Sequence, residues 1–367
     1  MLMRRKLSIL LVLGMVLAVA FTAGCASTSD QAATDNAADG QTYKWVAQSP
    51  WPEGTVLHWM AQEIAKNITE TSGGRLTVEM HPVGTIVGAL DLLDAVNGGS
   101  VDAIHSWEGY WMGQIPAAGF YAAMPLGMNE QEYMTWVLEG EGADLWQEIF
   151  ADYNVKVLPA GCYTPEIMYQ SKVPIRNLED LQGKKVRGVA FWGQLQSKLG
   201  ASVVSVAGNE IYQALERGVV DAIEYATPAS NYPLGYHEIA PYLVVPGIHQ
   251  PTSTFSFMVN EDKWNELPDD LKAIVELSCE NMWGKAWAHS ASEDMKVWQE
   301  YKKLEEAGKL TIIEFDPADQ QKIKEMADEL YAETAAKDPV FKKVYDSQNK
   351  FLAEYGPWRE AMQPQYK

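Results

Sequence analysis

The chain is poor in cysteine, in histidine and in positive charge. Its 367 residues include three Cys and six His, and 29 Lys and Arg stand against 49 Asp and Glu, for a formal net charge of −20. Because phosphate backbones are bound by clustered Lys and Arg, this balance excludes nucleic acid as a partner. The sequence also has no glycine-rich phosphate loop, no G-x-S-x-G motif and no pair of histidines four residues apart. Phosphate-loop, serine-hydrolase and zinc-protease chemistry therefore have no support.

A long apolar run occurs only at the N-terminus. A basic head at residues 4–6 precedes an apolar run at 7–21, and small residues then lead to Cys25. This run is too short to span a bilayer and is typical of an export signal. We predict that residues 1–24 are a lipoprotein signal peptide and that lipidated Cys25 anchors the protein outside the cytoplasmic membrane, in the periplasm. Because Thr22 stands where an aliphatic residue is usual, a plain secretory signal cleaved nearby is the alternative.

Residues 25–40 hold only small and polar side chains after the Cys, so we predict a flexible tether there. Cys162 and Cys279 are the other two cysteines. In an exported protein they either form one disulfide or stay free, and the sequence does not show that they meet in space. We favour two buried free thiols.

The rest of the chain is too long for one small core, since single cores stop growing beyond roughly 250–300 residues. Residues 55–71 have apolar side chains at helical spacing between strands predicted at 43–47 and 75–81, which is a β-α-β opening. A strand is predicted at 184–190 and a long strand at 251–260. Helices are predicted over 271–307 and 318–335, with expected boundaries at Pro317, Pro339 and Pro357.

One unit of sequence occurs twice. Residues 89–105 and 210–225 each have the pattern of a short amphipathic helix, a Gly stop and the strand Val-Asp-Ala-Ile, followed by polar and aromatic residues. In open α/β sheets ligands bind beyond the carboxyl ends of strands, so two such ends facing each other would line a cleft. The repeat therefore favours two α/β lobes. The alternative is that one good buried strand arose twice.

The segments NLEDLQGKKVR at 177–187 and EIYQALERGVVDAIE at 210–224 resemble the solute-binding proteins of tripartite ATP-independent periplasmic (TRAP) transporters. The resemblance covers nearly everything from Tyr43 onward. Further matching segments are Leu199 to Ala201, Gly235-Tyr236, Ala240 to Leu243, Pro246-Gly247 and Asp338 to Tyr345.

This resemblance implies a two-lobed α/β fold of the periplasmic-binding-protein type II class, with an interlobe cleft and a helical C-terminal region. Lobe I is expected at 41–163 plus about 253–300, lobe II at 164–252, and C-terminal helices packing on the lobes at 301–367. It implies no catalysis. A receptor of this kind closes on a small organic acid anion and delivers it to membrane permease subunits. The sequence does not decide between a monomer and a homodimer.

Within the family, Tyr110-Trp111 and Glu224-Tyr225 are similar to the branch that binds 2-oxo or 2-hydroxy monocarboxylates, such as pyruvate or lactate, with a metal ion. The carboxylate-clamping arginine of the family falls on Arg187. A guanidinium suits this role because it is always charged and its planar fork fits a carboxylate with two parallel hydrogen bonds. The alternative for an arginine on a strand is a surface ion pair.

The resemblance places the metal ligands at Glu166, at Glu224 with the carbonyl of Tyr225, and at Gln250. Glu166 stands where Gln is usual and Gln250 where Glu is usual, so the summed charge stays at −2. Two carboxylates would repel an anionic solute unless a cation lay between them, and oxygen ligands suit Na⁺ or Ca²⁺. Counting Arg187 and the solute, Ca²⁺ gives neutrality and is favoured over Na⁺. Glu166 and Gln250 as ordinary loop side chains are the alternative.

Five aromatic residues near predicted strand ends are candidate walls for the solute's carbon chain, although packing in the core is the competing role for each: Trp107, Tyr110, Trp111, Phe191 and Trp192. We interpret Trp51 and Trp59 as packing residues and His105 as a structural histidine.

Two other functions are alternatives. A carboxylate-active or glycoside hydrolase would use Glu166 and Glu224 as its paired carboxylates, but no spacing fixes which is the acid and which the nucleophile. A sensor subunit for a signalling kinase uses the same fold and differs only in its partner.

Overall fold

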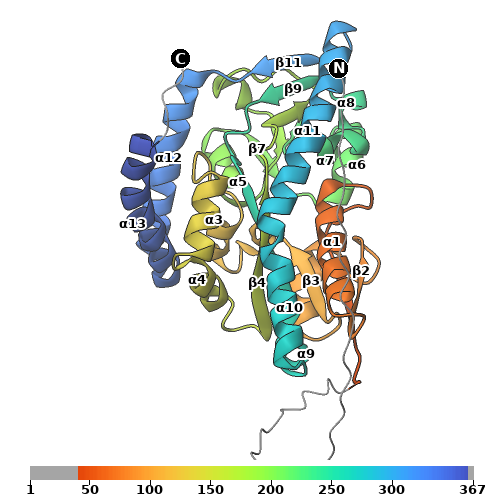
Figure 1. Cartoon of the computed structure of the whole chain (residues 1–367). Helices are drawn as coiled ribbons and strands as arrows, with labels where there is room; N and C mark the ends of the chain where they lie inside the picture. Colours follow the sequence, from red (N-terminus) through yellow and green to blue (C-terminus); the bar gives the residue numbers. More distant parts are fainter. Residues whose placement is uncertain (1–39, 363–367) are drawn as a thin grey trace, which may run out of the picture. The chain divides into compact units, whose positions relative to one another are not determined.

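The computed structural model describes residues 40–362; the predicted signal peptide, Cys25 and nearly all of the tether lie outside the described residues. The first 40 residues and Gln41–Lys367 are separate units of the chain. All the helices and strands below belong to the second unit (Figure 1).

The first of two sheets has the strand order β2-β1-β3-β10-β4. β1 pairs in parallel with β2 and β3, whereas β10 runs antiparallel between β3 and β4. β10 is buried along its whole length, and it returns late in the sequence to pair with early strands. The strands are β1 (Tyr43–Gln48), β2 (Leu76–His81), β3 (Ala103–Ser106), β4 (Val155–Tyr163) and β10 (Ser253–Asn260).

The second sheet has the order β11-β9-β5-β8-β6-β7. Its edge strand β11 comes from the C-terminal region, where the sequence analysis expected helices only. The four residues of β11 are too few to show a period against the long helices around them, and pairing with β9 gives the strand its hydrogen bonds. The strands are β5 (Tyr169–Ser171), β6 (Lys185–Arg187), β7 (Ser202–Val204), β8 (Ala222–Ile223), β9 (Tyr242–Val245) and β11 (Thr311–Glu314).

The helices follow the predicted pattern with two differences. The helices predicted at 55–71 and 318–335 are α1 and α12, but the helical stretch predicted at 271–307 is divided into α10 and α11. Pro317 and Pro339 begin helices, whereas Pro357 lies inside α13, so its prediction as a helix boundary is wrong. A proline inside a helix removes one backbone donor and crowds the carbonyl four residues before it, yet α13 continues past Pro357 to Met362.

The α-helices are α1 (Val56–Thr71), α2 (Leu92–Asn97), α3 (Glu130–Leu138), α4 (Gly142–Ile149), α5 (Ala190–Lys198), α6 (Ile211–Glu216), α7 (Pro228–Asn231), α8 (Tyr236–Ile239), α9 (Glu261–Asn265), α10 (Asp269–Glu280), α11 (Met282–Glu306), α12 (Pro317–Ala335) and α13 (Pro339–Met362). The 3₁₀ helices are η1 (Ala89–Asp91), η2 (Glu108–Trp111), η3 (Pro116–Tyr121), η4 (Glu179–Leu181), η5 (Gly208–Glu210) and η6 (Tyr232–Leu234).

The repeated unit forms the same local structure in both sheets. A 3₁₀ turn and a short helix lead into a strand: η1 and α2 into β3 of the first sheet, and η5 and α6 into β8 of the second. η2 follows β3 directly, and Glu224 and Tyr225 follow β8. The polar and aromatic residues after the two strands line one cavity, described below.

Long helices connect and cover the sheets. α11 packs on β4 of the first sheet and also on α7, which follows the second sheet's β8. α12 and α13 lie side by side, with α13 against α3 and α4 (Figure 1). Cys162 and Cys279 are buried free thiols, as favoured from the sequence.

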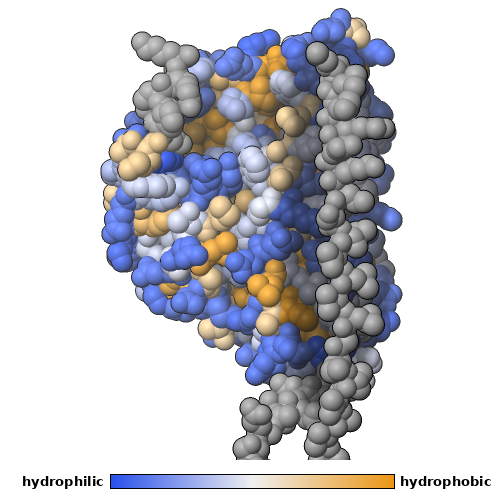
Figure 2. Space-filling view, in the orientation of Figure 1, coloured by the Kyte–Doolittle hydropathy of each residue, from blue (hydrophilic) through white to orange (hydrophobic). Residues whose placement is uncertain are grey.

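On the face shown in Figure 2, hydrophilic residues predominate and apolar residues show in separate small areas. Within residues 40–362, no helix has both the length and the apolar character needed to cross a membrane.

Candidate solute-binding site

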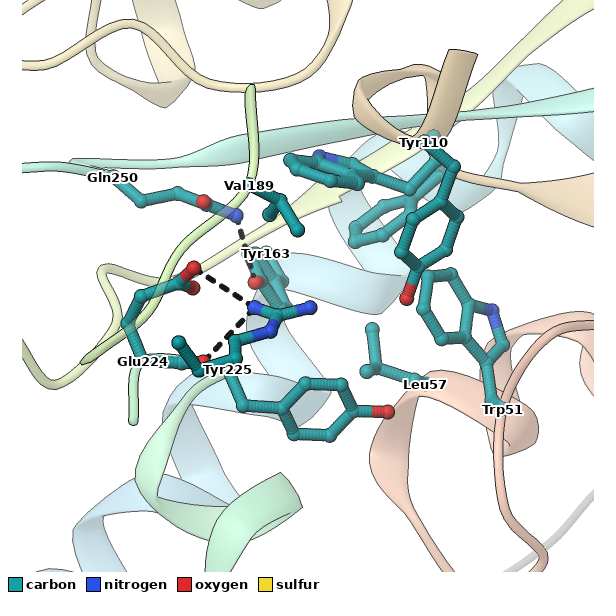
Figure 3. Close-up of a pocket in the computed structure, with 11 residues that line it drawn as sticks. Trp51, Leu57, Tyr110, Tyr163, Val189, Glu224, Tyr225 and Gln250 are labelled. Carbon is teal, nitrogen blue, oxygen red and sulfur yellow. Dashed lines mark hydrogen bonds and ion pairs between the residues drawn. The ribbon is translucent and has the colours of Figure 1, made fainter. Parts of the chain in front are cut away.

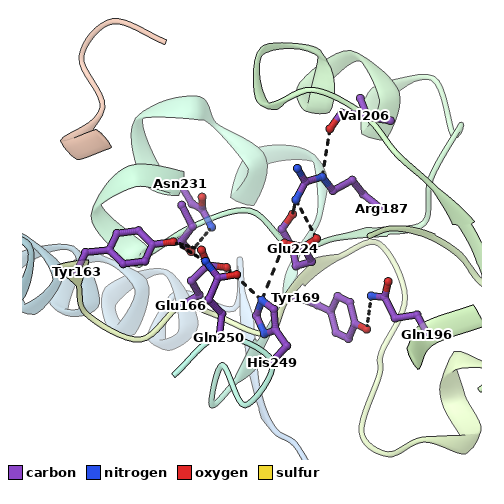
Figure 4. Close-up of polar contacts among 11 residues, drawn as sticks. Tyr163, Glu166, Tyr169, Arg187, Gln196, Val206, Glu224, Asn231, His249 and Gln250 are labelled. Atoms are coloured by element: carbon purple, nitrogen blue, oxygen red, sulfur yellow. Dashed lines mark hydrogen bonds and ion pairs between the residues drawn. The ribbon is translucent and has the colours of Figure 1, made fainter. Parts of the chain in front are cut away.

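Arg187, the last residue of β6, is 2% exposed. Its Nε donates to the carbonyl oxygen of Val206 at 3.2 Å, and its Nη1 donates to that of Glu224 at 2.9 Å (Figure 4). Nη1 also lies 2.8 Å from the Glu224 carboxylate oxygen Oε1. Two main-chain carbonyls thus fix the plane of the guanidinium and leave Nη2 for another partner.

Burial acts to lower the pKa of Arg187, but the charge of Glu224 and those of its other acidic neighbours together outweigh burial and raise the pKa. The guanidinium therefore keeps its charge inside the protein. A buried fixed cation of this kind is suited to hold an anion, because little solvent screens the attraction.

Two buried carboxylates, those of Glu166 and Glu224, lie near His249. The Nε2 atom of His249 is 3.1 Å from Glu166 Oε2 and 4.0 Å from Glu224 Oε2 (Figure 4). One ligand atom from each residue lies within 4.8 Å of the other two. Glu166 comes from the loop after β4, Glu224 follows β8, and His249 lies between β9 and β10. Three separate connections of the chain therefore meet at this cluster.

Hydrogen bonds hold Glu166 in place. The Tyr163 hydroxyl donates to Oε1 of Glu166, and Gln250 Nε2 donates to that hydroxyl at 3.1 Å. The backbone N–H of Glu166 also donates to the carbonyl of Gln250 at 3.2 Å. Glu166 and Gln250, predicted to exchange their usual residue types, are therefore direct neighbours.

Burial sets the protonation of this cluster. It raises the pKa of Glu166 to about 8, and it raises the pKa of Glu224 against the opposing charge of Arg187. It lowers the pKa of His249 to about 4, so the imidazole is neutral at pH 7. Arg187 then places a fixed positive charge beside the buried acids. The donor set fits a cation, which would supply the positive charge needed to keep both carboxylates ionised.

A small cavity adjoins these groups, and the strand ends of both sheets contribute to it. Its water-accessible volume is about 20 Å³, room for about one water molecule. In Figure 3 the acid Glu224 and the amide Gln250 lie on one side, and Trp51, Leu57 and Tyr110 lie on the other. The lining residues are Trp51, Leu57, Trp107, Tyr110, Tyr163, Arg187, Val189, Glu224, Tyr225, Gln250 and Phe255.

The cavity has a polar end and an aromatic end, and the predicted ligands are not all equally close to it. Glu166 contacts Tyr163 and His249 but does not line the cavity itself. The Tyr225 ring lies under the guanidinium, with Arg187 Cζ 5.8 Å from the ring centroid. Such a geometry adds a cation–π attraction to the hydrogen bonds that orient Arg187.

Trp107 and Tyr110 line the cavity, but three of the five aromatic candidates do not. Trp111, one residue past Tyr110 on η2, faces the core and packs against Phe150 at a centroid distance of 6.1 Å. Successive residues of a 3₁₀ helix point about 120° apart, so neighbours cannot share one wall.

Phe191 and Trp192 lie on α5, which turns them away from the cavity. Phe191 packs against Tyr331 of α12, with centroids 4.8 Å apart. Trp192 lies 5.7 Å from the ring of His249 and so borders the carboxylate cluster instead. Both residues were predicted as cavity walls because the strand that begins at residue 184 was expected to continue to residue 190, which would have placed them just after its end.

Trp51, interpreted as a packing residue, does pack edge-on against Phe255, with ring centroids 6.0 Å apart, and it also lines the cavity. Its Nε1 donates to His105 Nδ1 at 3.2 Å. Trp59 does pack, stacked on His289 at 3.7 Å, and His105 is a buried structural histidine whose pKa burial lowers to about 3. The sequence analysis missed several residues at the site: Leu57, Tyr163, Val189, His249 and Phe255. The signal available for Val189 was its place just after the segment at 177–187, whereas Tyr163 had no such signal.

Comparison with known proteins gives the family. Residues 47–338 match the family described as bacterial extracellular solute-binding protein, family 7. A monocarboxylate 2-oxoacid-binding periplasmic protein of Nostoc sp. is 28% identical over 331 residues, which cover 88% of each chain.

Two solved structures of TRAP periplasmic solute-binding proteins are each 29% identical, with TM-scores of 0.82. The one from Pseudoalteromonas atlantica holds sodium and pyruvate, and the one from Colwellia psychrerythraea holds calcium and pyruvate. Each covers 88% of this chain, which in turn covers 97% and 98% of theirs.

The predicted two-lobed α/β fold is confirmed by this similarity, and the hydrolase alternative is not favoured. Members of the family are periplasmic receptors rather than enzymes; they bind small organic acids and deliver them to membrane permease subunits. The chain belongs to the bacterial extracellular solute-binding proteins of family 7, the receptors of TRAP transporters.

Proposed function

We propose that this protein captures a short 2-oxo or 2-hydroxy monocarboxylate, such as pyruvate or lactate, together with a cation. One observation carries the proposal: a buried arginine contacts one of two neighbouring buried carboxylates, and Arg187 and Glu224 of this group line a small cavity. The relatives that are 28–29% identical bind a 2-oxoacid or pyruvate, which supports the same solute class here.

Arg187 would bind the carboxylate of the solute. Its Nε and Nη1 are already engaged by main-chain carbonyls, so the remaining donors of the guanidinium need little reorganisation to receive an anion. Burial raises the pKa of the Tyr110 hydroxyl to about 12, so this group stays protonated and can donate a second hydrogen bond. Both residues line the cavity.

Glu166 and Glu224 would hold the cation, with Gln250 and the carbonyl of Tyr225 as further oxygen ligands. The cation supplies positive charge to the solute's carboxylate and 2-oxygen. With both carboxylates ionised, Arg187 and a monocarboxylate leave the site two charges short of neutral, which Ca²⁺ makes up and Na⁺ only halves. We therefore favour Ca²⁺, and both ions occur with pyruvate in the related structures.

The aromatic end would limit the length of the solute. Trp51, Leu57 and Phe255 close around the space opposite the charged groups, which suits a methyl group better than a second carboxylate. This arrangement favours a monocarboxylate of about three carbons.

Calorimetry on the purified protein tests the proposal with pyruvate, propionate and malonate in the presence of Ca²⁺. Pyruvate should bind, propionate should bind at least about 10-fold more weakly because it lacks the 2-oxygen, and malonate should not bind. Propionate binding as tightly as pyruvate, or malonate binding more tightly, would refute the proposed solute class.

We also propose the lipid anchor on Cys25, lobe boundaries as expected from the sequence, and delivery to the permease of a TRAP transporter. Radiolabelled palmitate should label the protein in cells, and Cys25→Ser should remove the label.

Labelled pyruvate uptake should fall when the gene is deleted. Unchanged uptake would favour the sensor role of the same fold.

A further inference from the structure

His249 is a buried neighbour of Gln250, and no role has been given to it so far. Its side chain is 1% exposed, and its Nε2 faces both Glu166 and Glu224. Within residues 40–362, these three are the one group of His, Cys, Asp and Glu side chains close enough together to hold an ion. The cluster therefore offers one nitrogen as well as carboxylate oxygens.

The spacing of these atoms suits one shared ion. Two ligand atoms about 2.1 Å from a tetrahedrally bound ion are about 3.4 Å apart. The distances from His249 Nε2 to the two carboxylate oxygens, 3.1 and 4.0 Å, lie on either side of that value. Because all three ligand atoms lie within 4.8 Å of one another, small side-chain movements would place them around one centre.

Ion binding would not increase the number of His249 ring nitrogens that lack a partner. The Nδ1 atom of His249 has no hydrogen-bond partner in the part of the chain that the structure describes. If Nε2 carries the proton and donates to Glu166, Nδ1 is an unpaired acceptor; if Nε2 binds an ion, Nδ1 is an unpaired donor. Either way one ring nitrogen is unsatisfied, so ligation by Nε2 adds no further buried polar atom without a partner.

We propose that His249 is a ligand of the cation site and determines which ions it accepts, allowing Zn²⁺ to bind as well as Ca²⁺. This inference rests on the proposed cation site. Imidazole is a common ligand of Zn²⁺, whereas Ca²⁺ takes oxygen ligands almost exclusively. Two carboxylates and one imidazole are three protein ligands, which leaves coordination positions for the oxygens of the solute.

Competition with a chromophoric chelator tests this on metal-free protein, with Zn²⁺ and Ca²⁺ titrated separately. His249→Gln should weaken Zn²⁺ binding more than about 100-fold, since loss of a ligand exceeds the 10- to 100-fold typical of outer-shell changes. Ca²⁺ binding should change less than about 10-fold, because the new amide oxygen still suits a hard ion. His81→Gln, which removes a partly exposed histidine outside the cluster, is the matched control. Equal losses for both ions, or no loss for Zn²⁺, would overturn the proposal.

A second measurement does not depend on how well the variant folds. One equivalent of Cu²⁺ bound to the unmodified protein should show the electron spin echo modulation of a coordinated imidazole, and its absence would overturn the assignment. Pyruvate binding to the Ca²⁺-loaded protein is measured in parallel. If pyruvate binds but the imidazole signal is missing, only the role of His249 fails; if the signal is present but pyruvate does not bind, the proposed solute class fails instead.

Discussion

Replacing Arg187 with alanine should remove the anion site and should also destabilise the fold. Truncating one partner of a buried charge pair weakens binding by about 2–5 kcal/mol, which is roughly 30- to 4,000-fold in Kd. The same change leaves Glu224 buried without its counter-charge, at about 3–5 kcal/mol of unfolding free energy. Glu224 can take up a proton in response, because burial already raises its pKa, so the loss should fall at the lower end.

Calorimetry with pyruvate and Ca²⁺ measures the first effect, and denaturant unfolding measures the second. Arg217→Ala is the matched control, since Arg217 is an exposed arginine of the same sheet region, at the end of α6. Arg187→Lys separates charge from geometry: it keeps the charge but lacks the planar fork, so we expect binding between that of the unmodified protein and that of the alanine variant. Pyruvate affinity that is unchanged in Arg187→Ala would refute the assignment of Arg187 to the solute.

Three further predictions concern charge and motion. Removing the cation with a chelator should weaken pyruvate binding at least about 10-fold in calorimetry, and Glu224→Gln should lower the affinity for Ca²⁺. Equal pyruvate affinity with and without the cation would exclude a bridging ion. Solute and cation together should close the lobes by hinge motion, so scattering curves recorded with and without pyruvate should differ, and superimposable curves would count against closure. Burial raises the pKa of Glu108 well above its usual value, so this carboxyl binds a proton when folded and releases it when unfolded. The free energy of unfolding should therefore fall as the pH rises above about 4.5, by about 1.4 kcal/mol per pH unit from this group. The Glu108→Gln variant should lack that part of the slope. If the stability curves of variant and parent are parallel, Glu108 is ionised in the folded protein.

Elements with a long, regular pattern were predictable from the sequence. α1 and α12 lie within a residue of their predicted bounds, because a helical stripe over 16 or 19 residues has no competing interpretation. The short strands were harder to predict. β6 ends at Arg187, three residues before its predicted end, and α5 begins at Ala190. Because β6 ends early, Phe191 and Trp192 lie on α5 and pack in the core instead of lining the cavity.

The acidic site was predictable in part. Arg187 and Glu224 lie in segments whose order matches the family, and the structure brings them into contact. Glu166 and Gln250 carried no local pattern, yet their backbones pair and both contact Tyr163. No periodicity in either loop could have shown this, since the contact depends on the return of β10 beside β4.

The sequence by itself determined the long helices α1 and α12, the repeated unit, the family resemblance and the arginine, since each of these depends on residues close together along the chain. Only the tertiary structure decided that Trp51 lines the cavity and that His249 faces both acids. The direction in which a loop side chain points depends on contacts with segments far away in the sequence: Trp51 contacts His105, 54 residues later, and His249 contacts Glu166, 83 residues earlier. Local patterns carry no record of such contacts, so the composition of the site emerged only when the two sheets were brought together.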